Sequence, residues 1–365
     1  MKKIKLLLIS VMVFVMTGCS FLYSAVATND GYDIVPASDR PVYRAPAQQE
    51  RQDEHFERLQ AFDATHRQRF FNAPVWNVDN PIPGEVEVDP DLIMFHGAWY
   101  HIVESMTDEW IGITAVITLP QVRLDPDRIQ VGTDRYLDNS SIYLGVTGHR
   151  ESDVGLIWER MTEHSDYINI SISRQGMGFR PFWRFINAQG NNVYHNAPWQ
   201  MTQTYFFPGD TVRMSLLGTR PEYCVMHIEL LEPTTIPRYV AHRQRLNVQE
   251  EHVFVTPEFE APGLISGPMA FKIVNAIDQR ANEGRPTQPT NSSIMGAIWH
   301  SAFLFREIGG TLYKVPFSTE RTKTLSAPVA EGFITDQTHA LNRTTGFRTV
   351  DIMPQLAVDY NPFIR

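Results

Sequence analysis

Apolar and polar residues alternate over short runs along most of the chain between residues 81 and 317. A period of two residues is typical of strands that bury one face. Glycine, proline, asparagine and aspartate separate most runs, as in the connections of antiparallel sheets. No ten-residue helical pattern intervenes, so we predict a mainly β protein, a sandwich of two antiparallel sheets. The expected strands are Trp110–Leu119, Ser141–Val146, Val154–Met161, Tyr167–Ser173, Phe179–Ile186, Thr211–Leu217, Tyr223–Leu231, Met269–Ile277, Ile294–Phe305 and Thr311–Val315.

A helical spacing of apolar residues occurs in one stretch, between residues 48 and 71, and no proline interrupts it before Pro74. Glu, Arg and Gln fill the intervening positions, so we predict an N-terminal amphipathic helix docked on the sandwich. A helix that lies on a membrane or binds a partner is the alternative. Residues 318–365 contain apolar residues without a clear period and are expected to form a C-terminal extension. The apolar residues of the helix are Phe56, Leu59, Phe62 and Phe70.

The first residues predict export. Lysines at positions 2, 3 and 5 precede an apolar run from Leu6 to Val15. This run suits a signal peptide and is too short to span a bilayer. The following Met-Thr-Gly-Cys at 16–19 resembles the lipobox of bacterial lipoproteins, which implies lipidation of Cys19 and a membrane anchor. Because Ser20 is not the aspartate that retains lipoproteins at an inner membrane, the resemblance implies an outer-membrane location where the host has two membranes.

The small residues Ala25-Val26-Ala27 offer an alternative cleavage site, after which the protein would be soluble. With the lipobox, we expect five segments. They are a signal peptide at 1–18, a flexible tether at 19–49, the helix and its connection at 50–80, the sandwich at 81–317 and the C-terminal extension at 318–365.

Composition narrows the possible functions. A net charge of −9 argues against a nucleic-acid partner. Twenty-four prolines and 22 glycines suit a loop-rich β protein. The chain has two cysteines, so lipidation of Cys19 leaves Cys224 without an intrachain disulfide partner. Cys224 alternates with Met226, Ile228 and Leu230, which predicts a buried structural thiol.

A resemblance accompanies this strand pattern. The order of five short motifs resembles the strand succession of concanavalin A-like jelly-roll sandwiches, closest to secreted bacterial members and more remotely to the glutamic peptidases. It covers roughly residues 110–315 and supports a fold rather than an activity. The motifs are Ile-Tyr-Leu-Gly at 142–145, Asp-Val-Gly-Leu at 153–156, Phe-Trp at 182–183, Phe-Pro-Gly-Asp-Thr-Val at 207–212 and Gly-Ala-Ile-Trp at 296–299.

Carboxylates offer one candidate chemistry. In a strand, Glu151, Asp153 and Glu159 share a face. Glycoside hydrolysis needs a proton donor and a second carboxylate about 5 to 9.5 Å away, which Glu151 and Asp153 can supply. The laminarinase-like glucanases resemble Glu-x-Asp-x-(x)-Glu, however, and this chain has Val-Gly-Leu-Ile at 154–157 where the third acid would stand. Exposed charges at the rim of a sheet are the alternative interpretation.

The resemblance to glutamic peptidases implies a different pair. That family has a glutamine and a glutamate, the latter within a strand that reads Glu-Trp-x-x-Glu. This chain has Ile298-Trp299-His300-Ser301-Ala302 at that point and lacks both glutamates, while Gln279 lies on another segment. We therefore expect peptidase activity less than glycoside hydrolysis.

Aromatic residues suit sugar binding, because aromatic faces stack on pyranose rings and polar side chains pair with hydroxyls. Trp183 alternates with Arg184 in one expected strand, and Tyr143 lies in another. With Glu159, these residues are the candidate ligand-binding set. Burial in the core between the sheets is the alternative for the aromatic members.

Metal and cofactor motifs are not evident. The 12 histidines lack the spacings of zinc sites. Asp125, Asp127, Asp134, Asp138 and Asn139 could supply calcium oxygens, but turn chemistry explains them more simply. We therefore expect no metal and no cofactor.

The sequence thus predicts a membrane-anchored extracytoplasmic lipoprotein that binds polysaccharide without catalysis. A glycoside hydrolase using Glu151 and Asp153, or an envelope assembly protein, is the alternative.

Overall fold

The structure is a computed structural model of the chain. It describes residues 65–77, 79–85, 92, 95–131, 136–160, 177–197, 204–250, 252–280, 282–335 and 348–357. The predicted signal peptide, the tether, Cys19 and the expected strand Tyr167–Ser173 lie outside these residues. No helix in the described part of the chain is long and apolar enough to cross a membrane.

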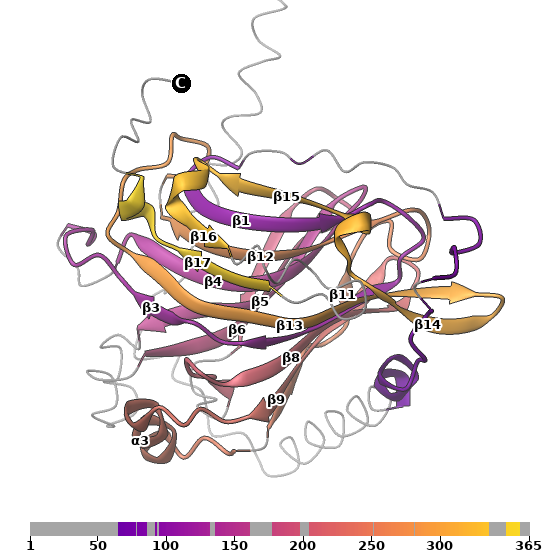
Figure 1. Cartoon of the computed structure of the whole chain (residues 1–365), viewed down its shortest axis with the longest axis horizontal. Helices are drawn as coiled ribbons and strands as arrows, with labels where there is room; N and C mark the ends of the chain where they lie inside the picture. The colour runs from indigo at the N-terminus through magenta and orange to yellow at the C-terminus, as the bar shows by residue number, and fades with distance from the viewer. Residues whose placement is uncertain are drawn as a thin grey trace, which may run out of the picture. The chain divides into compact units, whose positions relative to one another are not determined.

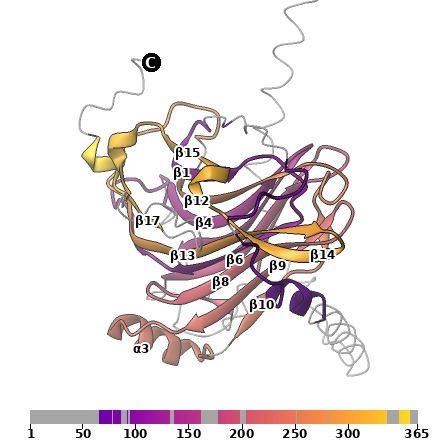
Figure 2. The same ribbon diagram turned by 45° about the vertical axis from the view of Figure 1, so that its right-hand side comes forward.

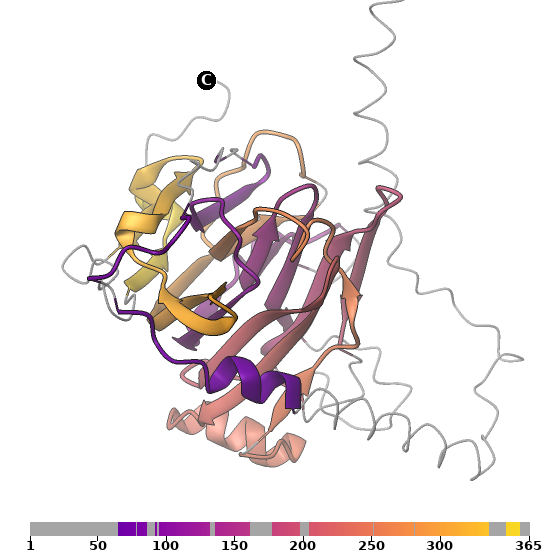
Figure 3. The ribbon, with the colours of Figure 1, turned by 90° about the vertical axis from the view of Figure 1, so that its right-hand side faces the viewer.

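Two antiparallel sheets form a sandwich, as predicted, and Figure 3 shows both layers from the side. The first sheet has seven strands in the order β15-β1-β12-β4-β5-β6-β7. Their bounds are β15 Thr322–Ala327, β1 Ala98–Ser105, β12 Ala270–Gln279, β4 Asp138–Thr147, β5 Glu151–Arg160, β6 Met177–Ile186 and β7 Asn192–Asn196.

The second sheet has ten strands, of which seven follow the path β10-β9-β8-β2-β13-β17-β16. In Figure 1, β8 and β9 lie below β1, β12 and β4 of the first sheet. The path comprises β10 Val253–Val255, β9 Tyr223–Glu232, β8 Thr211–Arg220, β2 Gly112–Thr118, β13 Ser293–Ile308, β17 Arg348–Ile352 and β16 Phe333–Thr335. The other strands are β3 Gln121–Arg123 and β14 Thr311–Pro316, which pair with β13, and β11 Phe259–Glu260, which pairs with β9.

The core lies between the sheets, where one face of each strand is buried. Val154 and Leu156 of β5 are fully buried there, as are Leu216 of β8 and Ile228 of β9. Cys224 is also fully buried, and this burial raises the pKa of its thiol well above the ordinary value. The predicted structural thiol is confirmed.

Helices cover part of the second sheet. Residues 65–71 are helical, within the stretch for which a helix was predicted, and Phe70 is buried edge-on against Phe305 at 4.8 Å. A second helix, α3 (Pro237–Leu246), follows β9 and lies beside β8 and β9 in Figure 2. An ion pair of 2.6 Å joins Arg243 of α3 to Asp210, the residue that precedes β8, and holds the helix against the sheet. The sequence pattern did not predict α3.

The described part of the C-terminal segment contributes strands to both sheets. β15 forms an edge of the seven-stranded sheet beside β1, and β17 pairs with β13 in the other sheet. The sandwich therefore extends beyond the boundary predicted at residue 317.

Candidate active site

The two faces of β5 have different surroundings. Val154, Leu156 and Trp158 point into the core. Glu151 and Asp153 lie on the opposite, outer face of the seven-stranded sheet, as the alternation predicted.

A row of charged residues crosses this outer face, because the strand register places them side by side. Lys323 of β15 is opposite Glu104 of β1, which is opposite Lys272 of β12. Lys272 is opposite Gly145 of β4, and Gly145 is opposite Asp153. Asp153 is then opposite Arg184 of β6. Cations and carboxylates alternate along the row, which favours their pairing across the strands.

Two cations hold the same two carboxylates. The Nη1 of Arg184 donates to Glu151 Oε2 at 2.9 Å and to Asp153 Oδ2 at 2.7 Å. The Nζ of Lys272 lies 3.0 Å from Asp153 Oδ1 and also donates to Glu151 Oε1. We call these four residues the carboxyl cluster.

The carboxyl cluster is partly open to solvent. The side chains of Lys272 and Asp153 are 6% and 7% exposed, whereas those of Arg184 and Glu151 are 21% and 34% exposed. The cluster is therefore open to solvent on the side of Glu151 and Arg184.

The environment pushes the pKa values of the two carboxyls apart. Lys272, with Arg184, lowers the pKa of Glu151 to about 2. Burial, with the neighbouring Glu151 carboxylate, raises the pKa of Asp153. Burial also raises the pKa of Glu104, the next acid in the row. Two interacting carboxyls with separated pKa values are typical of acid–base pairs.

The structure divides the predicted ligand-binding residues between the two faces. Tyr143 and Arg184 lie on the outer face near the carboxyl cluster, where Tyr143 is opposite Gly155. Glu159 lies farther along β5, 2.7 Å from Arg180. Trp183, however, packs on the core-facing side.

Three contacts establish the position of Trp183. It is opposite Val154 in the register, and its ring stacks on His195 with centroids 5.1 Å apart. It also contacts Phe254, at 6.2 Å. Trp183 therefore does not share a surface with Tyr143, Glu159 and Arg184, and the four do not form one binding site.

Lys272, Glu104 and Gly145 are absent from the predicted site. Lys272 interrupts the apolar residues of the expected strand at 269–277, which was an available signal. Glu104 lies in β1, which was not predicted. Gly145 belongs to the site only because the strand register places it between Lys272 and Asp153. Neither could be found from one strand alone.

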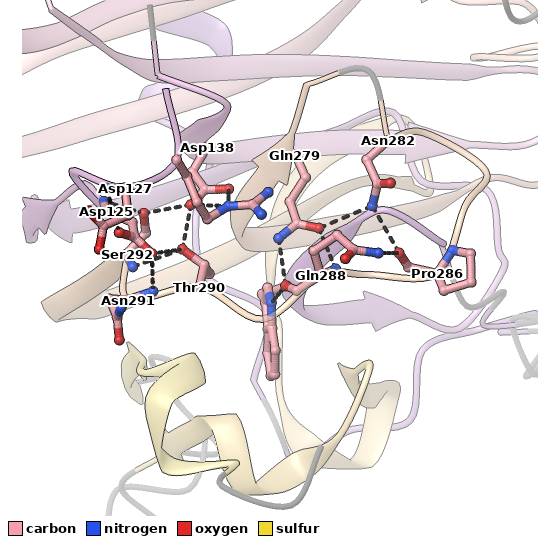
Figure 4. A network of polar contacts seen from close by, with 12 residues as sticks. Asp125, Asp127, Asp138, Gln279, Asn282, Pro286, Gln288, Thr290, Asn291 and Ser292 are labelled. Atoms are coloured by element: carbon pink, nitrogen blue, oxygen red, sulfur yellow. Dashed lines mark hydrogen bonds and ion pairs between the residues drawn. The ribbon is translucent and has the colours of Figure 1, made fainter. Parts of the chain in front are cut away.

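A second polar group, the loop network, lies where the chain returns from β12 to β13 (Figure 4). It consists of Arg128, Asp125, Asp138, Thr290 and Ser292. Asp138 accepts from Arg128 Nε at 2.9 Å, from Ser292 Oγ at 2.8 Å and from Thr290 Oγ1. Asp125 accepts from the N–H of Asn291 at 2.8 Å.

A side-chain amide fixes the rest of this loop. Gln279 donates to the carbonyl of Gln288 and accepts from its N–H, both at 2.7 Å, and Asn282 also donates to it (Figure 4). These polar side chains thus bond to one another and to the backbone. Among the described residues, no group of three or more His, Cys, Asp or Glu side chains could hold a metal ion.

Comparison with solved structures identifies peptidases with a similar sandwich. Scytalido-glutamic peptidase, crystallised with a peptide-based transition-state analogue, is 8% identical, with a TM-score of 0.41 over 69% of this chain and 98% of that chain. SCP-B, a member of the Eqolisin family of peptidases in complex with the tripeptide Ala-Ile-His, is 8% identical. Its TM-score is 0.39, over 70% of this chain and 98% of that chain.

No family model matches the chain. No curated protein matches it either. The resemblance to concanavalin A-like proteins therefore depends on strand order alone. At 8% sequence identity, the similarity to the solved structures concerns the fold and nothing more.

The predicted function was wrong. The solved structures described above are peptidases, not polysaccharide-binding proteins, glycoside hydrolases or assembly proteins. The geometry agrees with this correction, because Trp183 is not available for stacking beside Arg184. The expectation of a non-enzyme, with glycoside hydrolase as its enzymatic alternative, is corrected with it.

Proposed function

We propose that this protein hydrolyses peptide bonds with the carboxyl cluster. One observation carries the proposal: Glu151 and Asp153 contact the same two cations, and their pKa values are shifted in opposite directions. One carboxyl thus stays ionised in acid while the other takes up a proton more readily. Such a pair supplies a base and an acid at one place.

The two roles follow from the environments. The Glu151 carboxylate removes a proton from a water molecule, whose oxygen attacks the peptide carbonyl carbon. Asp153, in its protonated form, gives its proton to the nitrogen as the carbon–nitrogen bond breaks. The products are a carboxylic acid and an amine, and a proton moving from Glu151 to Asp153 restores the pair.

The cations favour this chemistry over glycoside cleavage. Attack on a carbonyl places negative charge on its oxygen, which Arg184 can stabilise. Glycoside cleavage instead develops positive charge on the sugar ring. Lys272 and Arg184 would oppose that charge, since they neutralise the carboxylates that would otherwise stabilise it.

The test is cleavage of unfolded proteins by the purified full-length chain from pH 3 to pH 8, with new termini identified by mass spectrometry. We expect Glu151→Gln to lower the rate by about 10²- to 10⁴-fold, the usual contribution of a general base. The matched control is Glu229→Gln. Glu229 pairs with Arg213 on the other sheet at 2.7 Å, with both side chains 32% exposed.

Two outcomes would contradict the proposal. One is the absence of new termini at every pH, and the other is full activity of a correctly folded Glu151→Gln variant. Circular dichroism of each variant checks its folding.

We also propose that the protein is exported and held at a membrane by lipid on Cys19. The support is the N-terminal sequence: a basic head, an apolar run and Met-Thr-Gly-Cys at 16–19. Each acyl CH₂ buried in lipid contributes about 0.8 kcal/mol, so two or more chains anchor a protein stably. Cys19→Ala should move the protein from the membrane pellet to the soluble fraction. A wild-type protein already in the soluble fraction would reject the anchor and favour cleavage after Ala27.

A further inference from the structure

Lys272 reaches across a whole strand to join the carboxyl cluster. It belongs to β12, whereas both acids belong to β5, and β4 lies between these strands. Neighbouring strands are about 4.8 Å apart, so β12 and β5 are separated by roughly twice that distance. The Lys272 Nζ nevertheless lies 3.0 Å from Asp153 Oδ1. Its side chain must therefore pass over β4.

Gly145 is the residue of β4 that it passes over. Gly145 is opposite Lys272 on one side and opposite Asp153 on the other. A Cβ atom built on Gly145 would overlap the Cε of Lys272 and lie 2.5 Å from Asp153 Oδ1. Any other residue here would displace the lysine or the acid.

The backbone gives no other reason for glycine at this position. The φ angle of Gly145 lies outside the left-handed region. Glycine also weakens the interior of a strand, and it often marks a place where another group approaches closely. Here the approaching groups are the stem of Lys272 and the carboxylate of Asp153.

We infer that Gly145 is a positioning residue: because it lacks a side chain, Lys272 can cross β4 and hold both acids of the carboxyl cluster. The inference rests on the proposed function and deepens it, since it concerns the pH range in which the Glu151 carboxylate of the same site stays ionised. The contact geometry itself does not depend on any activity.

Several charged or titratable groups determine how Glu151 ionises. Lys272 and Arg184 favour its ionised form, and Lys272 has the larger effect on its pKa. Burial opposes its ionisation, and Glu151 in turn raises the pKa values of the neighbouring acids Asp153 and Glu104. The phenol of Tyr143, on β4, also faces this group. Loss of the lysine contact would leave Arg184 as the cation bound to Glu151.

The sign of the effect follows. The pKa of Glu151 is lowered in the folded protein to about 2, from an ordinary value of 4.5. Its contribution to stability is therefore present above pH 4.5 and is lost as the pH falls towards 2. Displacing Lys272 raises the folded-state pKa, so this pH-dependent contribution becomes smaller.

The experiment measures the titration of the Glu151 carboxyl by carbon NMR in the full chain, with no substrate present. We expect Gly145→Ala to raise its midpoint by about one pH unit or more, as loss of a close opposite charge does. Lys272→Ala should raise it similarly. In the Lys272→Ala background, Gly145→Ala should add a smaller shift, because the stem is gone and Asp153 Oδ1 is the remaining close contact of the added methyl group.

If Gly145→Ala alone does not fold, the stabilities of the two single variants and the double variant are compared by urea unfolding. The double variant should then be less destabilised than Gly145→Ala alone, because removing the lysine stem leaves Asp153 Oδ1 as the close contact of the added methyl group. An equal effect of Gly145→Ala in both backgrounds, or an unchanged Glu151 midpoint, would overturn the inference. These measurements use no peptide, so their failure is separate from a failure to detect peptide cleavage.

Discussion

The carboxyl cluster and the loop network both place buried acids on the seven-stranded sheet, but their partners differ. In the loop network, Asp138 is fully buried and accepts hydrogen bonds from one guanidinium and two hydroxyls. In the carboxyl cluster, two acids share two cations, and Glu151 and Arg184 remain partly exposed. The first arrangement satisfies one charge inside the protein. The second couples two titrating groups at a surface that is partly open to solvent.

The comparison separates structural acids from candidate catalytic acids. A buried carboxylate surrounded by fixed donors fastens the loop that supplies them. A pair of acids whose pKa values are pushed apart can exchange protons with a bound molecule. Substitutions in the loop network should therefore lower stability and leave activity unchanged, whereas substitutions in the carboxyl cluster should lower activity.

The largest expected effect on stability belongs to the loop network. Asp138→Ala leaves Arg128, Thr290 and Ser292 without their shared acceptor. Breaking one side of a buried ion pair costs about 3–5 kcal/mol. We expect a loss of this size in urea unfolding at pH 7, while the activity per folded molecule is unchanged.

The control for this substitution is Asp127→Ala. Asp127 is exposed, and the contact it makes in the network comes from its backbone N–H. Its replacement should change stability by no more than about 0.5 kcal/mol. A similar loss for both variants would show that the loop network does not hold the loop.

The burial of each strand explains which parts of the fold the sequence could predict. The sequence of β9 alternates between apolar residues at Cys224, Met226, Ile228 and Leu230 and polar residues at His227 and Glu229, and this strand was found. β1 is buried on both faces, with Trp99 on one side and Tyr100 on the other, so its residues do not alternate. The C-terminal strands β15, β16 and β17 are short, and their pattern was too brief to distinguish them from an irregular extension.

The candidate site was predictable only within one strand. Alternation placed Glu151 and Asp153 together correctly, because both belong to β5. Lys272 comes from a strand more than one hundred positions away, and its place depends on a register that local sequence does not specify. The predicted ligand-binding site, however, combined Trp183 with Arg184. These residues are neighbours in one strand, so their side chains point to opposite faces of the sheet.

Replacement of Trp183 should have a smaller effect on stability than replacement of Asp138. Its ring packs against the core beside His195 and Phe254, on the face opposite the carboxyl cluster. It is only partly buried, so Trp183→Ala should cost about 2–3 kcal/mol, less than the loss of a fully buried tryptophan. Urea unfolding measures this loss. Peptide cleavage per folded molecule and the Glu151 titration should both stay unchanged, because the Trp183 ring packs on the opposite face of the sheet from the acids. A large loss of cleavage in a folded Trp183→Ala variant would mean that the two faces of the sheet are coupled, and the separation of core from site would then fail.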